Sequence, residues 1–370
     1  MKKKLLLLGG GHAHLETLAA LETIQKRGHE VTVVAPSPHH YYSGMGPGML
    51  GGTYTPESIR FDTEAMVTKR GARFVRGLAV AIDAGEKTVR LSSGELLDYD
   101  VLSNNVGSYV KSDLIVAPGS TVYSVKPIES LLTLKQALLN RCHEKVLQIA
   151  IAGGGPSSAE VAGNILQLVQ NARGQRPVIT LYSRSGFFDH FDEKIKTGVT
   201  NILEAKGIQR VEGDAVVRVD GPSIGLASGR QCPADFVISA TGVRPSPLFA
   251  DSHLPTGPDG GLLVNPFLQC TAHPEIFGGG DCIHFQEHPL NKVGVYAVRQ
   301  NPILLHNLLA QLEDTPLTPF HPGGNYLLVF NLGEGTGYLH KNGIRFHGKI
   351  AFRIKDFIDR RFMTKYQRLM

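Results

Sequence analysis

The chain repeats one four-part pattern: an apolar strand, a run of three glycines, a helix and a second apolar strand. The first copy runs from LLLLGGGHAH to EVTVVA, and the second from QIAIAGGGPSS to PVITLY. In a parallel α/β sheet this unit places the free N–H groups of a helix N-terminus beyond the end of a strand, where they favour anions. Two copies, with glycine runs starting at Gly9 and Gly153, predict two related nucleotide-binding folds.

The second glycine run has the cleaner nucleotide-binding pattern. Gly153 permits a tight turn, Gly155 lets the backbone approach a pyrophosphate, and Ser158 is small enough for packing of the helix on the strand. Pro156 and Ser157 open the helix, and we assign them to the same phosphate site. The alternative is a glycine turn that binds nothing, but the apolar strand before it and the helix after it favour binding.

The residues after the second strand of this unit bear on which nucleotide is bound. Tyr182, Ser183 and Arg184 stand where an acidic residue usually holds a ribose 2′-hydroxyl. Arg184 is suited to a 2′-phosphate, so we expect NADPH to be accepted alongside NADH. The alternative is that Arg184 is a solvated surface residue.

The first glycine run departs from the pattern. Gly9 and Gly11 occupy the turn and close-approach positions, but His14 replaces the third glycine, and no acidic residue follows the strand EVTVVA. A nucleotide here would depend on the backbone N–H groups of this loop, with Ser37 or a water on the ribose. We assign to this site Gly9, Gly11, His12, Ala13, His14 and Ser37.

Two motifs far downstream complete the pattern. IFGGGDC contains Gly280 and Asp281, and ISATGV contains Thr241 and Gly242. With both glycine runs, in this order, the chain resembles the two-dinucleotide-binding flavoproteins, the pyridine nucleotide-disulfide oxidoreductase superfamily. The resemblance implies FAD held between the first glycine run and Asp281, and a nicotinamide nucleotide held at the second.

Within that superfamily the chain most resembles type II NADH dehydrogenases. It is nearer still to the NADH-dehydrogenase-like module fused ahead of selenophosphate synthetase in some chains. The similar segments are YYSGMGPGMLGGTY, SNNVGS (with Gly107), GVYAVRQNP and KDFIDRRFM. The kinase half is absent, so selenium chemistry is not carried over. The four cysteines form no CxxC pair, which argues against thiol–disulfide chemistry.

The resemblance implies that hydride passes from NADH or NADPH to FAD and that electrons then pass to a quinone-like acceptor. Glu160 matches a glutamate that approaches the nicotinamide–flavin stack in type II dehydrogenases; otherwise it complements the helix dipole. Gln300 matches a glutamine near the quinone end of the flavin, although its neighbours depart from the family's Ala-Gln-Gln-Gly run. Lys292 is a candidate positive charge beside the flavin, and Tyr42 and Ser43 flank the ring or belong to the core.

The net charge of +5 is concentrated in the tail. Residues 341–370 contain nine Lys or Arg and two Asp, a net +7. This distribution argues against a nucleic-acid surface and for one local electrostatic contact. The fifteen histidines form no convincing ligand set, and we expect no metal.

The last segment, IAFRIKDFIDRRFMTKYQRLM, predicts a basic amphipathic helix. Its apolar stripe comprises Ile350, Ile354, Phe357, Ile358, Phe362, Tyr366 and Leu369. We expect residues 350–370 to bind a membrane surface, which places the protein in the cytoplasm, peripheral on the inner face of the cell membrane. Packing on the protein's own body or on a second copy in a homodimer is the alternative.

We therefore predict an α/β fold with two Rossmann-like domains. The FAD domain takes residues 1–115 and 245–318, the NAD(P)H domain 116–244, and a small sheet with the basic helix 319–370. Two rival functions stay open. One is an NAD(P)H-dependent flavin reductase of a soluble protein or of a selenium or sulfur species, and the other is a sensor that binds FAD or NAD without turnover.

Overall fold

The computed structural model describes residues 1–370 and contains two five-stranded parallel sheets. The first has the order β22-β9-β1-β2-β5, formed by Ile276–Gly278, Val101–Asn104, Lys4–Leu8, Glu30–Ala35 and Arg73–Arg76. The second has the order β12-β19-β13-β14-β15, formed by Val122–Ser124, Phe236–Ser239, Gln148–Ala152, Val178–Ser183 and Gln209–Glu212. The repeated pattern thus forms two Rossmann-like sheets, and the predicted α/β fold is confirmed.

The two sheets divide the molecule into a first half, built on the sheet that contains β1, and a second half, built on the sheet that contains β13. Helices cover the sheet in each half. In the first half, the helix expected after the first glycine run is divided into η1 (His12–His14), α1 (Leu15–Ala19) and α2 (Leu21–Lys26). The long α9 (Gly294–Glu313) packs against η1 and α1. The second half carries α5 (Ser130–Arg141), α6 (Pro156–Asn171) and α7 (Glu193–Ala205).

Short elements fill the connections. One small antiparallel sheet is formed by β6 (Ala79–Asp83), β7 (Thr88–Leu91) and β8 (Leu96–Asp98). A second is formed by β16 (Val216–Asp220), β17 (Ser223–Leu226) and β18 (Gln231–Pro233). In this second sheet, β11 (Ile115–Val116) pairs with β16 in parallel. The remaining elements of the first half are β3 (His39–Tyr41), η2 (Ser43–Met45), α3 (Gly46–Leu50), η3 (Glu57–Ile59), β4 (Arg60–Asp62), α4 (Thr63–Thr68), α8 (Leu248–Asp251), β21 (Leu262–Val264), η4 (Gly280–Cys282) and β23 (Ile283–Phe285).

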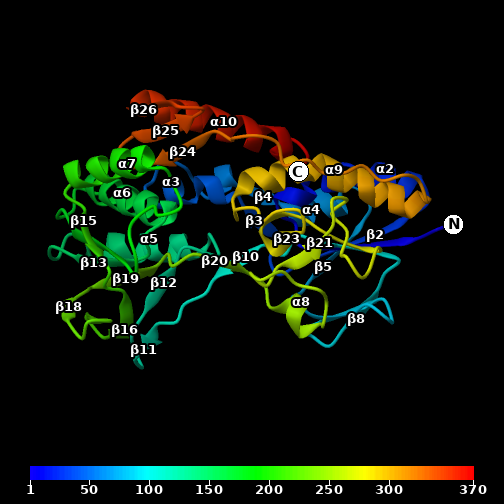
Figure 1. The fold of residues 1–370 in the computed structure, drawn as a ribbon, viewed down its shortest axis with the longest axis horizontal. Helices are drawn as coiled ribbons and strands as arrows, with labels where there is room; N and C mark the ends of the chain where they lie inside the picture. Colours follow the sequence, from blue (N-terminus) through cyan, green and yellow to red (C-terminus); the bar gives the residue numbers. More distant parts are fainter.

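The chain passes between the halves on a pair of antiparallel strands, β10 (Ser108–Val110) and β20 (Val243–Pro245). They lie between the two halves in the middle of the molecule (Figure 1). The expected boundary at 244/245 falls within β20, and the one at 115/116 falls within β11, a few residues after β10. We propose these positions as the domain boundaries.

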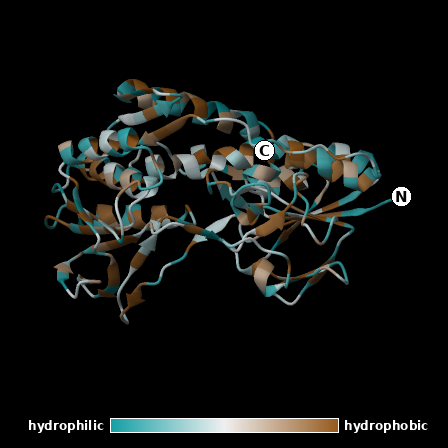
Figure 2. Ribbon diagram, viewed as in Figure 1, coloured by the Kyte–Doolittle hydropathy of each residue, from teal (hydrophilic) through white to brown (hydrophobic).

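One hydrophobic core of 78 buried residues runs through both halves. The four leucines of β1, Leu5 to Leu8, are each at most 1% exposed. Hydrophobic residues concentrate in the central strands of both sheets (Figure 2). Because the core is continuous, the two halves form one packed body with a fixed relation between their glycine loops.

The C-terminal region forms a three-stranded antiparallel sheet and a helix. The elements are β24 (Leu328–Asn331), β25 (Gly337–Lys341), β26 (Ile344–Gly348) and α10 (Lys349–Gln367). Helix α10 packs on this sheet and reaches β4 in the first half, so it extends from one half to the other (Figure 1). No helix combines the length and hydropathy that crossing a membrane requires.

Candidate functional site

One cavity of about 1250 Å³ joins the two glycine loops. It lies at the carboxyl ends of both parallel sheets, where ligands of open α/β sheets bind. Most of the predicted site residues line it: Gly9, Gly11, His12, Ser37, Ser43, Gly107, Gly153, Gly155, Pro156, Ser157, Glu160, Arg184, Thr241, Gly242, Gly280, Asp281 and Lys292. Ala13, His14, Tyr42 and Gln300 lie outside its wall.

Asn105 fixes the first glycine loop. A Cβ added at Gly9 or Gly11 would lie 2.3 or 2.2 Å from an oxygen of Asn105, so neither position admits a side chain. The Asn105 amide accepts from the Ala13 N–H (3.3 Å) and donates to the Gly279 carbonyl (2.6 Å), which ties the loop to the GGGD segment. The N–H groups of Gly10 and Gly11 have no partner in the protein, as a phosphate site requires.

His14 takes the place of the missing glycine by hydrogen bonding. Its buried ring contacts the Gly9 carbonyl through Nδ1 (2.6 Å) and Ser103 Oγ through Nε2 (2.8 Å). Burial lowers the pKa of His14 to about 4, so the ring is neutral. Because His14 lies outside the cavity wall, we assign it to holding the turn instead of contacting the nucleotide.

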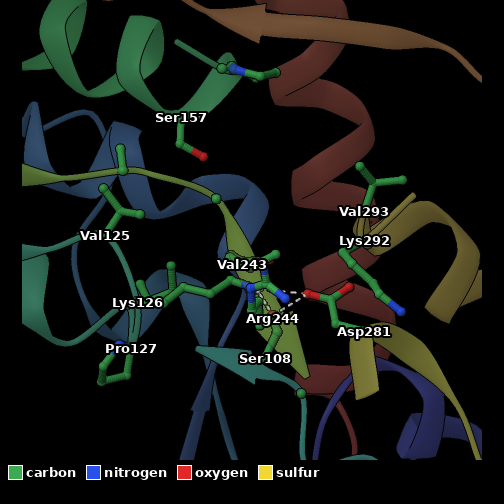
Figure 3. A pocket seen from close by; sticks show the side chains of 18 of the residues that line it. Ser108, Val125, Lys126, Pro127, Ser157, Val243, Arg244, Asp281, Lys292 and Val293 are labelled. Carbon is green, nitrogen blue, oxygen red and sulfur yellow. Dashed lines mark hydrogen bonds and ion pairs between the residues drawn. The ribbon is translucent and has the colours of Figure 1, made fainter. Parts of the chain in front are cut away.

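Asp281 projects into the cavity within a half-buried charge cluster (Figure 3). Its Oδ2 accepts from Lys126 Nζ (2.8 Å) and Ser108 Oγ (2.7 Å). Burial opposes ionisation, but Lys126 and Ser108 outweigh it and hold the pKa of Asp281 below its usual value. Lys126 was not predicted, because it is far from Asp281 in sequence and carries no motif of its own.

Lys292 also lines the cavity, but its charge is balanced. Its Nζ lies 2.7 Å from Asp259 Oδ2 and donates to the Ile283 carbonyl. Asp259 in turn contacts His284 Nδ1 at 3.1 Å. Lys292 therefore lies in the cavity wall as a candidate positive charge beside the flavin, with its charge shared with Asp259.

The segment around Gln300 on α9 has structural contacts. The Gln300 Oε1 accepts from the Gly280 N–H at 2.7 Å, and the residue is 1% exposed. Arg299 donates to the carbonyls of Pro322 and Gly324, which fixes the loop before β24. Gln300 thus positions the turn that carries Asp281 and does not itself face the cavity.

The second glycine loop presents open backbone. A Cβ at Gly153 would lie 2.1 Å from the Ala240 carbonyl, whereas one at Gly155 would meet nothing within 4 Å. The N–H groups of Gly154 and Gly155 have no protein partner, and they stand at the start of the 16-residue α6. This geometry fits a phosphate at the helix N-terminus.

Arg184 is exposed at the rim of the cavity, directly after β14. The Ser183 Oγ donates to the Gly186 carbonyl. The Asp189 carboxylate accepts from the Gly186 N–H, so Asp189 is hydrogen-bonded within the turn that follows β14. Thr241 and Gly242 line another part of the same cavity.

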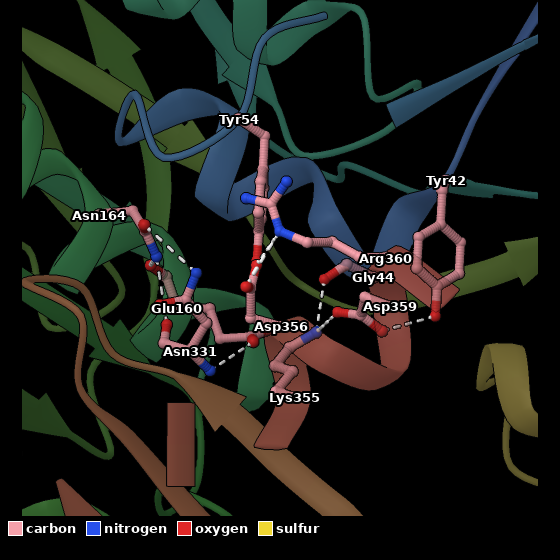
Figure 4. Close-up of polar contacts among 10 residues, drawn as sticks. All are labelled: Tyr42, Gly44, Tyr54, Glu160, Asn164, Asn331, Lys355, Asp356, Asp359 and Arg360. Atoms are coloured by element: carbon pink, nitrogen blue, oxygen red, sulfur yellow. Dashed lines mark hydrogen bonds and ion pairs between the residues drawn. The ribbon is translucent and has the colours of Figure 1, made fainter. Parts of the chain in front are cut away.

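Glu160 belongs to a buried polar network that sequence reasoning did not find (Figure 4). Its Oε1 accepts from the Asn331 N–H at 2.8 Å, and burial raises its pKa to about 7. Lys355 of α10 also lines the cavity and donates to Asp359 (2.6 Å) and to the Gly44 carbonyl (2.7 Å). Tyr42 donates to the other oxygen of Asp359 at 3.0 Å.

The predicted apolar stripe of α10 is divided between two faces, so that expectation is wrong in detail. Tyr366 is buried at 3% exposure, whereas Ile350, Phe357 and Ile358 are 66%, 66% and 44% exposed. The inner face is partly polar because Lys355 and Asp359 complete the network described above. The outer face combines those three apolar side chains with exposed basic ones: Arg353, Arg360, Arg361, Lys365 and Arg368.

Relatives that cover nearly the whole chain include quinone oxidoreductases by name. A type II NADH:quinone oxidoreductase of Staphylococcus saprophyticus is 25% identical over 396 residues, covering 98% of this chain and 96% of the relative. The sulfide:quinone oxidoreductase of Aquifex aeolicus superposes with a TM-score of 0.81 at 17% identity, covering 99% and 92% of the two chains. NDH2 of Plasmodium falciparum, solved with NADH, gives 0.80 at 15% identity and covers both chains completely.

The match to a protein family spans most of the chain and both glycine loops. Residues 3–306 match the pyridine nucleotide-disulphide oxidoreductases. The chain belongs to the pyridine nucleotide-disulphide oxidoreductase family.

Proposed function

We propose that the protein is an FAD-dependent oxidoreductase that takes hydride from NADH or NADPH and passes electrons to a quinone-like acceptor. The observation that carries this proposal is the single cavity joining both glycine loops. Two nucleotides bound at these loops would meet inside one cavity. The type II NADH:quinone oxidoreductase that matches nearly the whole chain supports the choice of acceptor.

The first site fits FAD. The unpartnered N–H groups of Gly10 and Gly11 would hold its pyrophosphate, and Asp281, kept ionised by Lys126, would accept from ribityl hydroxyls. When bound, FAD supplies a ring that exchanges hydride and electrons. The chain itself would then align FAD with the nicotinamide nucleotide and exclude water from between them.

The second site fits the nicotinamide nucleotide. Gly154 and Gly155 would bind its phosphates through their N–H groups, and Arg184 would bind a 2′-phosphate if one is present. Glu160 holds a proton at its carboxyl group near neutral pH, because burial raises its pKa to about 7. We propose that it donates this proton during reduction of the acceptor.

The outer face of α10 is suited to an anionic membrane. Ile350, Phe357 and Ile358 are exposed among basic side chains, and each Lys or Arg near such a surface contributes about 1 kcal/mol. We propose peripheral attachment to the inner face of the cell membrane through this face; a homodimer through the same face is the alternative.

The four segments YYSGMGPGMLGGTY, SNNVGS, GVYAVRQNP and KDFIDRRFM support a further proposal. We propose that the chain is closely related to the module fused to selenophosphate synthetase.

Steady-state oxidation of NADH with a soluble quinone tests the proposed function. The purified protein loaded with FAD should consume NADH and quinone one to one. Gly155→Val should raise the KM for NADH at least tenfold, since its side chain would occupy space open to the phosphates. Gly324→Val, at an equally open position outside the cavity, is the matched control. Absence of quinone-dependent NADH oxidation would contradict the proposal.

A further inference from the structure

Phe188 has an unusual backbone conformation for a bulky residue. It lies in the turn after β14, and its φ of 59° falls in the left-handed region, which costs free energy for a residue with a Cβ. Eight non-glycine residues have a positive φ, and Phe188 alone among them lines the cavity that contains the nucleotide sites. Strained residues persist where the surrounding structure fixes them, and they concentrate at ligand sites.

Two sets of contacts hold Phe188 in this conformation. Its ring is 2% exposed, and the ring centroid lies 6.2 Å from that of Phe191 and 6.0 Å from that of Phe330. The backbone just before it is held by the Gly186 N–H, which donates to Asp189 at 2.9 Å. The turn is therefore anchored both in the hydrophobic core and within itself.

This conformation directs the Phe188 N–H at the second glycine loop. The N–H donates to the Gly154 carbonyl at 2.8 Å. The turn also packs closely on Gly154, where an added Cβ would lie 2.5 Å from Ser183 Oγ and 2.7 Å from the Gly186 carbonyl oxygen. The turn therefore fixes the orientation of the Gly154 carbonyl.

The orientation of the Gly154 carbonyl determines that of the Gly155 N–H, because both belong to one peptide unit. This unit is trans and planar, so the N–H points away from the carbonyl and thus away from Phe188. Gly155 is open, since an added Cβ would meet nothing within 4 Å, and its N–H has no protein partner. The next residue, Pro156, has no N–H, so the loop depends on Gly155 for a donor at the start of α6.

We propose that Phe188 is a positioning residue for the nicotinamide nucleotide. Through the Gly154 carbonyl, its N–H holds the Gly155 N–H toward the phosphates, and its buried ring maintains the left-handed conformation that this requires. The inference rests on the proposed function, since it needs a nicotinamide nucleotide at the second loop. The strain at Phe188 is then part of the site, because it aims a donor before the ligand arrives.

Substitutions by alanine and by glycine separate this role from simple packing. Both remove the ring, but glycine adopts a positive φ freely and alanine does not. In the FAD-loaded, oxidised protein, Phe188→Ala should raise the Kd for NAD+ about tenfold, measured by titration calorimetry, and Phe188→Gly only about threefold. A packing role predicts the opposite order, because glycine leaves the larger space and the more flexible turn.

Leu268 is the matched control for these variants. It is fully buried and has a φ of 64°, but it lies outside the cavity wall. Leu268→Ala and Leu268→Gly should leave the Kd for NAD+ unchanged. The Kd for FAD should be the same in the native protein and in both Phe188 variants, because Phe188 acts on the second loop alone.

Each outcome decides the matter. A Kd for NAD+ that is unchanged in Phe188→Ala, or higher in Phe188→Gly than in Phe188→Ala, would overturn the role of Phe188. A native protein that binds FAD but not NAD+ would instead overturn the proposed function, and this inference with it.

A second pair of variants carries the test if Phe188→Ala does not fold. Asp189→Ala and Asp189→Asn both remove the charge, but only alanine removes the acceptor of the Gly186 N–H. Asp189→Ala should therefore bind NAD+ more weakly than Asp189→Asn. Equal Kd values in these two variants would overturn the inference.

Discussion

Single residues explain why an irregular first loop still forms a nucleotide site. His14 supplies by two hydrogen bonds the fixation that a glycine usually gives by close packing, and Asn105 ties the loop to the GGGD segment. The glycines, Asp281 and Arg184 were predictable as residues that line the cavity, because the motifs that contain them are local in the sequence. Asn105, Lys126 and Phe188 were not, because their partners lie far away in the chain.

The protonation of Glu160 should appear in the pH dependence of turnover. With a pKa of about 7, its proton is present below neutral pH and lost above it. We expect the kcat for quinone reduction to fall as pH rises through about 7, and Glu160→Gln to lower kcat tenfold or more and abolish that inflection. An unchanged inflection in the variant would contradict the role assigned to Glu160.

The same group affects stability with a defined sign. Its folded-state pKa lies above the ordinary value of 4.5, so the folded protein holds this proton more tightly than the unfolded chain. The contribution of Glu160 to stability is complete below about pH 4.5 and is lost as pH rises to about 7. Glu160→Gln should therefore gain stability relative to the native protein at pH 8 compared with pH 5, measured by urea unfolding.

Arg184 should govern the use of NADPH. Reversing its charge places a carboxylate beside the expected 2′-phosphate. We expect Arg184→Glu to raise the KM for NADPH at least tenfold while the KM for NADH changes less than threefold, measured by initial rates. Equal effects on both nucleotides would mean that Arg184 does not contact the 2′-phosphate.

At the scale of elements, the sequence predicts both βαβ units. Each unit has its own apolar strand segments, and a glycine turn marks where the first strand ends and the helix begins. Helix α10 was predicted as a helix but not in its contacts. Lys355 and Asp359, spaced four residues apart, have the pattern of a solvated face, yet they are buried against Tyr42 and Gly44. A charge pattern does not reveal a polar partner from another element.

The outer face of α10 is the part to test for membrane binding. Deleting residues 350–370 would also remove the buried Met363 and Tyr366 and damage the core. Replacing Ile350, Phe357 and Ile358 together by serine leaves the inner face intact and should reduce flotation with anionic vesicles severalfold without lowering Tm. The control is the native protein with neutral vesicles, which should float poorly. Equal flotation of native and variant protein on anionic vesicles would refute membrane contact through this face.

At the scale of the whole molecule, a continuous core holds two sheets so that their glycine loops open into one cavity. The antiparallel pair β10 and β20 carries the chain across and back near the middle (Figure 1). The order of motifs in the sequence predicted two nucleotide folds. Their shared cavity was not predictable, because it depends on how the two sheets pack.

The most direct measurement is an anaerobic visible spectrum of the FAD-loaded protein, recorded alone, after NADH and then after a soluble quinone. Two nucleotides meeting in one cavity predict a flavin band that NADH bleaches and the quinone restores. A protein that takes up FAD but is not bleached by NADH or NADPH would contradict the account and favour a sensor without turnover. Failure to take up FAD at all would show that the first glycine loop is not a nucleotide site.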